Sequence, residues 1–143
     1  MKNLNEILDE WEKDCPFDDD LVKEGYRKPK LHNKYYKVYR KFKRQKSVIY
    51  ENLKDLEFAK KLYYSGQASA DTYKEKGAFN QTLKSSELEM YVRADNEVRE
   101  LRLKYIKVIE CVESLEEIIK QINTRDFTIK EINIALKFQA GGM

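Results

Sequence analysis

The residues with the most obvious chemistry in this sequence are cations, and many of them lie in one stretch. Residues 31–46, LHNKYYKVYRKFKRQK, interleave lysines and arginines with aromatic residues and contain no acid. Between Lys23 and Lys46 there are 11 Lys and Arg and one acid, whereas the rest of the chain has 17 Lys and Arg against 24 Asp and Glu. A basic block on an otherwise acidic chain indicates contact with a polyanion, which is nucleic acid, an acidic protein or a membrane surface.

Helical phase separates this stretch into two faces. At about 100° per residue, one side carries the apolar positions Leu31, Tyr35, Val38, Tyr39 and Phe42, which we expect to pack against a partner helix. The opposite side carries Lys30, Lys34, Lys37, Arg40, Lys41 and Arg44. A merely solvated face usually mixes signs because like charges at i,i+3 and i,i+4 repel, so this face is predicted to bind. Lys43 and Tyr36 lie on the flank, where Tyr36 is placed to stack on a base.

Signatures of catalysis and metal binding are weak. His32 is the only histidine, no nucleophile and base can be paired, and there is no Gly-rich phosphate loop. Asp18-Asp19-Asp20 is typical of a helix cap. Cys15 and Cys111 match no metal spacing, and they indicate a reduced, intracellular protein. We therefore expect no enzymatic activity, no cofactor and no metal site.

Composition favours a single all-α domain. The 143 residues include 37% charged side chains but only 5 Gly and 2 Pro, too few for the many turns of a sheet-rich fold. The acidic, amphipathic N-terminus is unlike a signal peptide. No apolar run approaches the roughly 18–20 residues of a membrane span. We expect a soluble protein with no membrane contact that stays where it is made.

The predicted elements are a long antiparallel helical hairpin with short flanking helices at both ends. Residues 1–28 hold short helices: Asn3 caps the first, Cys15-Pro16 ends it, and Gly25 and Pro29 interrupt the next. Residues 29–123 form the hairpin, with a loop at 65–80 that begins at Ser65-Gly66, and its second helix spans about 80–123. Within the C-terminal segment 124–143, the capping box TIKE, with Thr128 as N-cap, opens a helix to about Phe138.

A sustained apolar seam marks the second long helix. Spacings of three and four alternate along Tyr91, Ala94, Val98, Leu101, Tyr105, Val108, Val112, Leu115, Ile119 and Ile122. The first long helix has a looser version of the same pattern. Val92, Ile106, Ile109 and Ile118 lie beside the seam with little to cover them. They predict further packing, either onto the terminal helices or between subunits.

Three segments carry a resemblance to a known family. KKLYYSG at the end of the first long helix, ADNEV at 94–98 and TRDFTIKEI followed by FQAG near the C-terminus together resemble the UvsY family of recombination mediator proteins of T-even-type bacteriophages. The resemblance runs from about Leu31 to Gly142. It implies a non-enzymatic protein that binds single-stranded DNA and assembles into a ring-like homo-oligomer, a hexamer or heptamer, in the cytoplasm of the infected host bacterium. Its implied partners are a RecA-like phage recombinase and the phage single-stranded-DNA-binding protein.

The resemblance also implies roles for particular residues. The family's DNA-binding segment, typically Lys-Ala-Arg-Leu, reads Phe58-Ala59-Lys60-Lys61 here, so a phenylalanine stands at the first lysine position. Together with the basic block, the predicted DNA contacts are Lys34, Lys37, Arg40, Lys41, Lys43, Arg44, Lys54, Lys60, Lys61 and Tyr36. The segment implied in self-assembly contains Arg125, Phe127, Ile129, Lys130, Ile132, Leu136 and Phe138.

The implied function is loading of the recombinase onto DNA covered by single-stranded-DNA-binding protein, in phage homologous recombination, repair and recombination-dependent replication. The alternative is a helical phage scaffold or adaptor whose basic face binds an acidic protein. A steep salt dependence of single-strand binding would separate the two.

Overall fold

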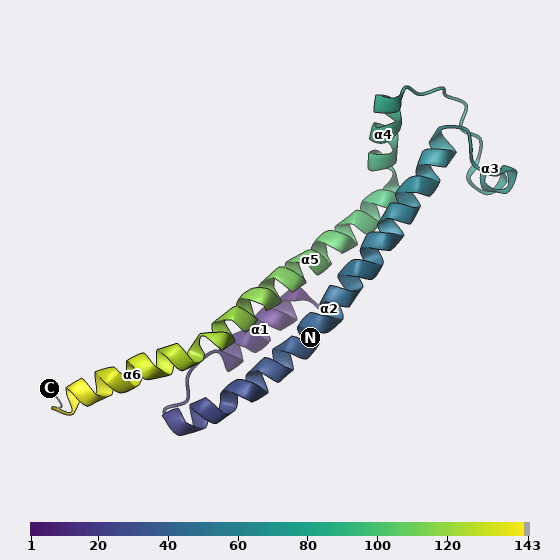
Figure 1. The fold of residues 1–143 in the computed structure, drawn as a ribbon. Coiled ribbons are helices and arrows are strands. Elements are labelled where there is room, and N and C mark those ends of the chain that lie inside the picture. The colour runs from purple at the N-terminus through teal and green to yellow at the C-terminus, as the bar shows by residue number, and fades with distance from the viewer. Residues whose placement is uncertain (142–143) are drawn as a thin grey trace. The chain divides into compact units, whose positions relative to one another are not determined.

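The structure, a computed structural model, describes residues 1–141, which contain helices and no strand (Figure 1). The helices in order are α1 (Leu4–Asp14), α2 (Leu21–Tyr64), α3 (Ala70–Lys76), α4 (Ser85–Ala94), α5 (Asn96–Asn123) and α6 (Arg125–Gln139). The all-α prediction is confirmed. The last two positions of the predicted C-terminal segment, 142 and 143, lie outside the described residues. Within residues 1–141, no helix is long and apolar enough to cross a lipid bilayer.

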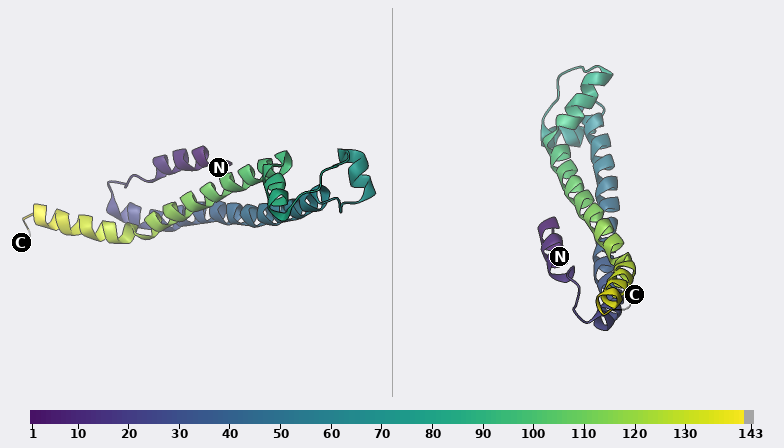
Figure 2. Two further views of the ribbon diagram at one scale, coloured as in Figure 1. Left: turned by 90° about the horizontal axis from the view of Figure 1, so that it is seen from above. Right: turned by 90° about the vertical axis from the view of Figure 1, so that its left-hand side faces the viewer.

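The chain forms two compact units, and both α2 and α5 contribute to each of them. Unit 1 comprises Met1–Lys43 and Ile109–Met143, and unit 2 comprises Arg44–Val108. Inside each unit, a segment of α2 lies beside a segment of α5 (Figure 2). The Tyr39 hydroxyl donates to Glu116 in unit 1, and the rings of Tyr50 and Tyr105 lie 5.9 Å apart in unit 2. The predicted pairing of the two long helices is therefore present within each unit.

The core of unit 1 is apolar and lies where α1, α2 and α5 meet. Its buried side chains are Ile7, Leu31, Tyr35, Phe42, Cys111, Val112, Leu115, Ile118 and Ile122. Asn3 caps α1 as predicted, because its side-chain oxygen accepts a hydrogen bond from a backbone N–H of the first turn at 2.9 Å. Trp11 of α1 donates to Gln121 of α5 and packs edge-on against Tyr35. Helix α1 thus contacts α5, and Ile118, which the sequence left beside the seam with little to cover it, is buried.

Helix α2 begins at Leu21, well before the predicted start at Pro29. The prediction treated Gly25 and Pro29 as breakers, but both lie inside the helix. Asp20 caps the helix, because its carboxylate accepts hydrogen bonds from two backbone N–H groups of the first turn. Proline inside a helix removes one hydrogen bond and crowds the carbonyl four residues earlier, here that of Gly25. Tertiary contacts of the first turns, above all those of Glu24, offset that cost.

A buried ion pair joins the start of α2 to the start of α6. Glu24 is fully buried, and its carboxylate accepts hydrogen bonds of 2.9 and 2.6 Å from the Arg125 guanidinium. Arg125 also donates to the backbone carbonyls of Cys15 and Pro16, and its guanidinium lies 4.2 Å from the ring centre of Phe17. Burial alone would raise the pKa of Glu24, but a backbone N–H and the Arg125 guanidinium hold that pKa below its usual value. The pair therefore stays charged, and it fixes three segments that are distant in sequence.

Helix α6 also begins earlier than predicted. The TIKE pattern placed the N-cap at Thr128, whereas the helix starts at Arg125 after Thr124. Thr128 lies inside the helix, and its hydroxyl bonds to the carbonyl of Thr124. Because Arg125 is held by Glu24, the chain is already helical before the local capping signal is reached.

In unit 2, α2 ends at Tyr64, as predicted from Ser65-Gly66. Gly66 has a φ of 79°, a left-handed conformation that favours glycine. The backbone N–H of Gln67 bonds to the carbonyl of Leu62, which completes a Schellman turn. The following loop holds α3 and is anchored by rings in mutual contact: Tyr63, Tyr64, Tyr73, Phe79 and Tyr91.

The predicted second long helix, 80–123, is divided at Asp95, and residues 80–84 are not helical. Asp95 has a ψ of 133°, and its carboxylate accepts hydrogen bonds from two backbone N–H groups in the first turn of α5. The same carboxylate accepts from the Tyr64 hydroxyl at 2.7 Å and pairs with the Lys60 ammonium at 3.2 Å. Aspartate competes with the helix by bonding to nearby backbone groups, so a regular apolar seam did not reveal the break.

We predict that Glu24→Ala lowers the free energy of unfolding by about 3 kcal/mol, because Arg125 is left buried without its carboxylate. Urea denaturation followed by circular dichroism measures the change. The control is Glu117→Ala, which removes an exposed carboxylate that is in no ion pair of the described chain. The double variant Glu24→Ala/Arg125→Ala should lose less than the sum of the single variants.

The same pair gives a pH dependence. Because the pKa of Glu24 is lowered in the folded state from its usual 4.5, its contribution is complete above that value. It is lost as the pH falls through the lower folded pKa. Stability of the wild type should therefore decline more steeply below about pH 4.5 than that of Glu24→Ala. The prediction is contradicted if the stability losses of the two single variants add up in the double variant. It is also contradicted if wild type and Glu24→Ala lose stability in parallel as the pH falls.

Candidate nucleic-acid interface

Several solvent-facing cations of α2 in unit 1 are in no ion pair within residues 1–141. Lys37, Arg40 and Lys41 are exposed, and none of them is in an ion pair within residues 1–141. Lys30, about two turns before Lys37, is exposed in the same way. Cations that repel one another and are not neutralised internally favour the approach of a polyanion. This face, Lys30, Lys37, Arg40 and Lys41, is called the cationic face below.

An aromatic group lies beside the cationic face. Tyr36 is 40% exposed, and its ring stacks on that of His32 at a centroid distance of 5.4 Å. The guanidinium of Arg40 lies 6.0 Å from the centre of the Tyr36 ring, and Lys43 lies 5.6 Å from the ring of Tyr39. An exposed ring among cations is the arrangement on which unstacked bases of single-stranded nucleic acids bind. Tyr35 and Phe42, in contrast, are buried, as helical phase predicted.

Lys34 belongs to the internal structure of unit 1. Its ammonium pairs with Glu10 and with Asp14 of α1, and the hydroxyl of Tyr35 donates to the same Asp14. Burial lowers the pKa of Lys34, but hydrogen bonds to these carboxylates outweigh it and raise that pKa. Lys34 therefore holds α1 onto α2. The sequence counted it with the other cations because its partners lie 20 and 24 residues away.

The predicted DNA-binding lysines of unit 2 also divide into those that pair with acids and one that does not. Lys60 is only 6% exposed and pairs with Asp95 at 3.2 Å and with Glu97 at 3.4 Å. Burial lowers the pKa of Lys60, yet its hydrogen bond to Asp95 gives a net rise. Lys61 is exposed and is in no ion pair of the described chain. Lys54 pairs with Glu57 at 3.4 Å.

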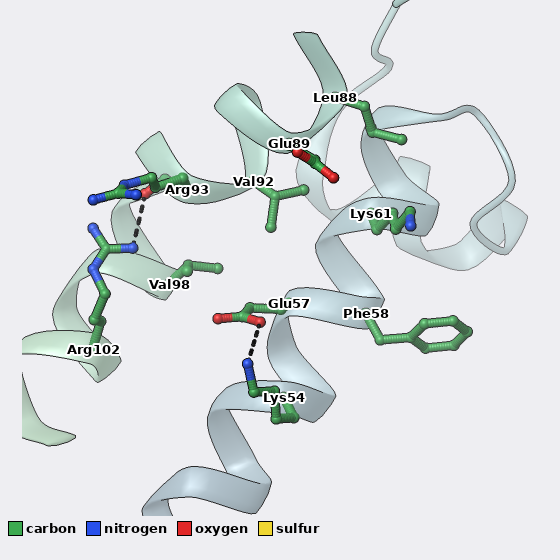
Figure 3. Close-up of a pocket in the computed structure, with 10 residues that line it drawn as sticks. All are labelled: Lys54, Glu57, Phe58, Lys61, Leu88, Glu89, Val92, Arg93, Val98 and Arg102. Atoms are coloured by element: carbon green, nitrogen blue, oxygen red, sulfur yellow. Dashed lines mark hydrogen bonds and ion pairs between the residues drawn. The ribbon is translucent and has the colours of Figure 1, made fainter. Parts of the chain in front are cut away.

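The neighbouring lysines 60 and 61 thus differ in their ion pairs, although both were predicted DNA contacts. The resemblance places Lys60 at the family's arginine position, whereas Lys61 stands at its leucine position. The ammonium of Lys60 is engaged with acids inside unit 2, so we leave it out of the proposed DNA contacts. Arg44 is exposed, as the helical phase predicted for it. Sequence reasoning missed Arg93 and Arg102, which line a cavity of unit 2 (Figure 3). They lie among acids in the sequence, so no basic block marks them.

The predicted self-assembly segment forms α6. Arg125 is buried in its pair with Glu24 and is not part of a free surface. Ile129 and Ile132 are half-buried. The exposed apolar side chains are Phe127, Ile134, Leu136 and Phe138, of which the sequence prediction lacked Ile134.

No group of three or more His, Cys, Asp and Glu side chains that could hold a metal ion occurs within residues 1–141. His32 is occupied by stacking on Tyr36, and Cys111 is buried, which raises the pKa of its thiol.

Comparisons with known proteins agree with this picture. The sequence model of one family, described as "Recombination, repair and ssDNA binding protein UvsY", matches residues 10–142. Among solved structures, the chain is similar to the crystal structure of the bacteriophage T4 recombination mediator protein UvsY, with a TM-score of 0.86 and 22% sequence identity. That similarity covers 98% of this chain and 99% of the other. A search of curated proteins gave no match. The fold is shared with the T4 protein, and the family match spans nearly the whole sequence: the chain belongs to the UvsY family of recombination, repair and single-stranded-DNA-binding proteins.

Proposed function

We propose that this protein is a non-enzymatic phage recombination mediator that binds single-stranded DNA through the cationic face of α2. The carrying observation is that Lys37, Arg40 and Lys41 are exposed and unpaired within residues 1–141, while the neighbouring Lys34 is neutralised. Phosphates replace the missing carboxylates, and Tyr36 offers a ring for an unstacked base. Membership of the UvsY family supports the same role.

The mechanism is physical rather than chemical. A strand held by phosphate neutralisation has a different path from a strand held by a covering protein. Binding it therefore weakens the hold of the phage single-stranded-DNA-binding protein and favours a filament of the RecA-like recombinase. The site of this action is the cytoplasm of the infected host bacterium. Several weak sites in one assembly raise the total affinity without any new contact.

Helix α6 supports assembly into a ring-like homo-oligomer. At about 100° per residue, Phe127, Ile134 and Phe138 share one side of the helix, whereas Ile129, Ile132 and Leu136 share the opposite side. A helix that is apolar on two sides needs two partners. One side packing on each of two neighbouring subunits gives head-to-tail contacts, which close into a ring when the rotation allows. A simple two-fold dimer leaves one of the sides exposed.

We predict that Lys37→Ala/Arg40→Ala/Lys41→Ala weakens binding to single strands of every sequence alike. Each lost phosphate contact lowers the steepness of the log–log salt dependence by about 0.7, so three lost contacts remove about 2. Fluorescence anisotropy across a salt series measures both quantities. The charge-matched control is Lys104→Ala/Lys107→Ala/Lys120→Ala, whose side chains are exposed on α5. An unchanged affinity and an unchanged slope would contradict DNA binding by the cationic face. That result would favour the alternative, a scaffold or adaptor whose cationic face binds an acidic protein.

The adjacent lysines 60 and 61 give a second prediction. Lys60→Ala should lower the free energy of unfolding by about 3 kcal/mol, because Asp95 is left buried without its ammonium partner. Lys61→Ala should leave stability unchanged and reduce the salt slope of DNA binding by about 0.7. Thermal melting and anisotropy of both variants are compared. The assignment is reversed if Lys60→Ala melts like the wild type and binds DNA more weakly.

The assembly gives a third prediction. Wild-type protein should sediment as a homo-oligomer larger than a dimer, and Phe127→Ser/Phe138→Ser should reduce it to small species. Substitution is preferable to deletion of α6, because deletion also removes Arg125 from Glu24. The control is Leu103→Ser, an exposed leucine on α5. A wild type that sediments as a monomer at micromolar concentration in moderate salt contradicts the proposal.

A further inference from the structure

Unit 2 contains a cavity that the cationic face does not include. It has a volume of about 510 Å³ and lies between the last turns of α2, helix α4 and the first turns of α5 (Figure 3). Its apolar lining includes Phe58, Leu88 and Val92, and its cations include Lys61, Arg93 and Arg102. The break at Asp95 creates it, because α4 departs from the line of α5 there and leaves a hollow beside α2.

The charges around this cavity are unbalanced. Four cationic side chains and two acidic ones line it, and one of the acids, Glu57, is taken by Lys54 at 3.4 Å. Arg93 is in no ion pair of the described chain. Arg102 donates to the backbone carbonyl of Arg93 at 3.2 Å, which brings two guanidinium-bearing residues to the same side of the hollow. Glu89 is the other lining acid, so cations exceed acids around the cavity, and this excess favours an anionic group such as phosphate.

The other side of the cavity is aromatic. Phe58 is 63% exposed, and Figure 3 shows it with Lys61 on the side away from Arg93 and Arg102. An exposed aromatic ring beside a hollow offers a face on which a base can stack. Leu88 and Val92 extend the apolar lining from α4. A ligand that fits must therefore be flat and aromatic at one end and anionic at the other.

We propose that this cavity binds one nucleotide of a single strand, with the base against Phe58 and its phosphate near Arg93 and Arg102. The volume lies within the range of pockets that hold small ligands. A base-stacking ring that is not selective for sequence suits a protein that binds any single strand. The inference rests on the proposed function, since the strand is its source of nucleotides. It adds a site formed by α2, α4 and α5 to the phosphate contacts of the cationic face.

The test separates bases from phosphates. Anisotropy titrations compare an oligothymidylate with an oligonucleotide of equal length built from abasic units, which keeps the phosphates and lacks the bases. Phe58→Ala should weaken binding of the first by about tenfold and of the second by less than twofold. Leu103→Ala, the control, removes an exposed apolar side chain outside the cavity and should change neither. Equal losses on both strands, or no loss on either, overturn the inference.

A second variant tests the phosphate end. Arg93→Gln should weaken both oligonucleotides, with Lys104→Gln as the charge control. It is preferable to a change at Arg102, whose guanidinium also supports the turn between α4 and α5. If Arg93→Gln loses no more affinity than Lys104→Gln, no phosphate binds at this end of the cavity. Melting curves of every variant should match the wild type, because these side chains are not in the buried core.

Binding of free thymidine monophosphate tests the cavity without depending on the binding of a DNA strand. Nuclear magnetic resonance shifts confined to the cavity residues, and lost in Phe58→Ala, support the site and show that it also takes free nucleotides. If the wild type binds neither oligonucleotide, the proposed function fails. In that case the resonance shifts caused by free thymidine monophosphate are the remaining test of the cavity, and their absence overturns the inference.

Discussion

The Arg125 guanidinium, buried against Glu24, is the interaction on which the arrangement of unit 1 depends. One cation satisfies a buried carboxylate and two backbone carbonyls of the turn after α1, and it covers the ring of Phe17. Since charges removed from water must be paired, every segment that contacts this cation is held in place. The start of α2, with its interior proline, and the start of α6 are both determined here. The two apolar sides of α6 therefore have defined directions within unit 1.

The same constraint decides which cations remain for a ligand. A lysine beside carboxylates, such as Lys34 or Lys60, is neutralised inside its unit and acts as a clamp. A lysine one to three residues away, such as Lys37 or Lys61, stays in solvent with its full charge. Position in a basic block thus says less about binding than the presence of an acid from another helix. The DNA contacts that we propose are cations that the fold has left unpaired.

Much of the fold could be predicted from the sequence, because it depends on local signals. The periodic seam, the cap at Asn3 and the turn at Gly66 gave the helix type and several ends correctly. Errors occurred where a long-range contact overrode a local signal: at Pro29, at Thr128 and at the break beside Asp95. The candidate site was predictable in part for the same reason. Helical phase identified the exposed face, but it could not show which cations meet acids distant in sequence.

The cationic face has a further consequence for how the protein responds to ionic strength. Repulsion among its unpaired charges is a cost carried by the folded state, and that cost is screened by salt over a Debye length of about 8 Å under physiological conditions. Salt also competes with the protein for phosphates and so weakens a complex with DNA. Ionic strength therefore acts with opposite signs on this surface. It relieves the free protein and penalises the bound one, so the surface is most strained, and most ready to accept a strand, when salt is low.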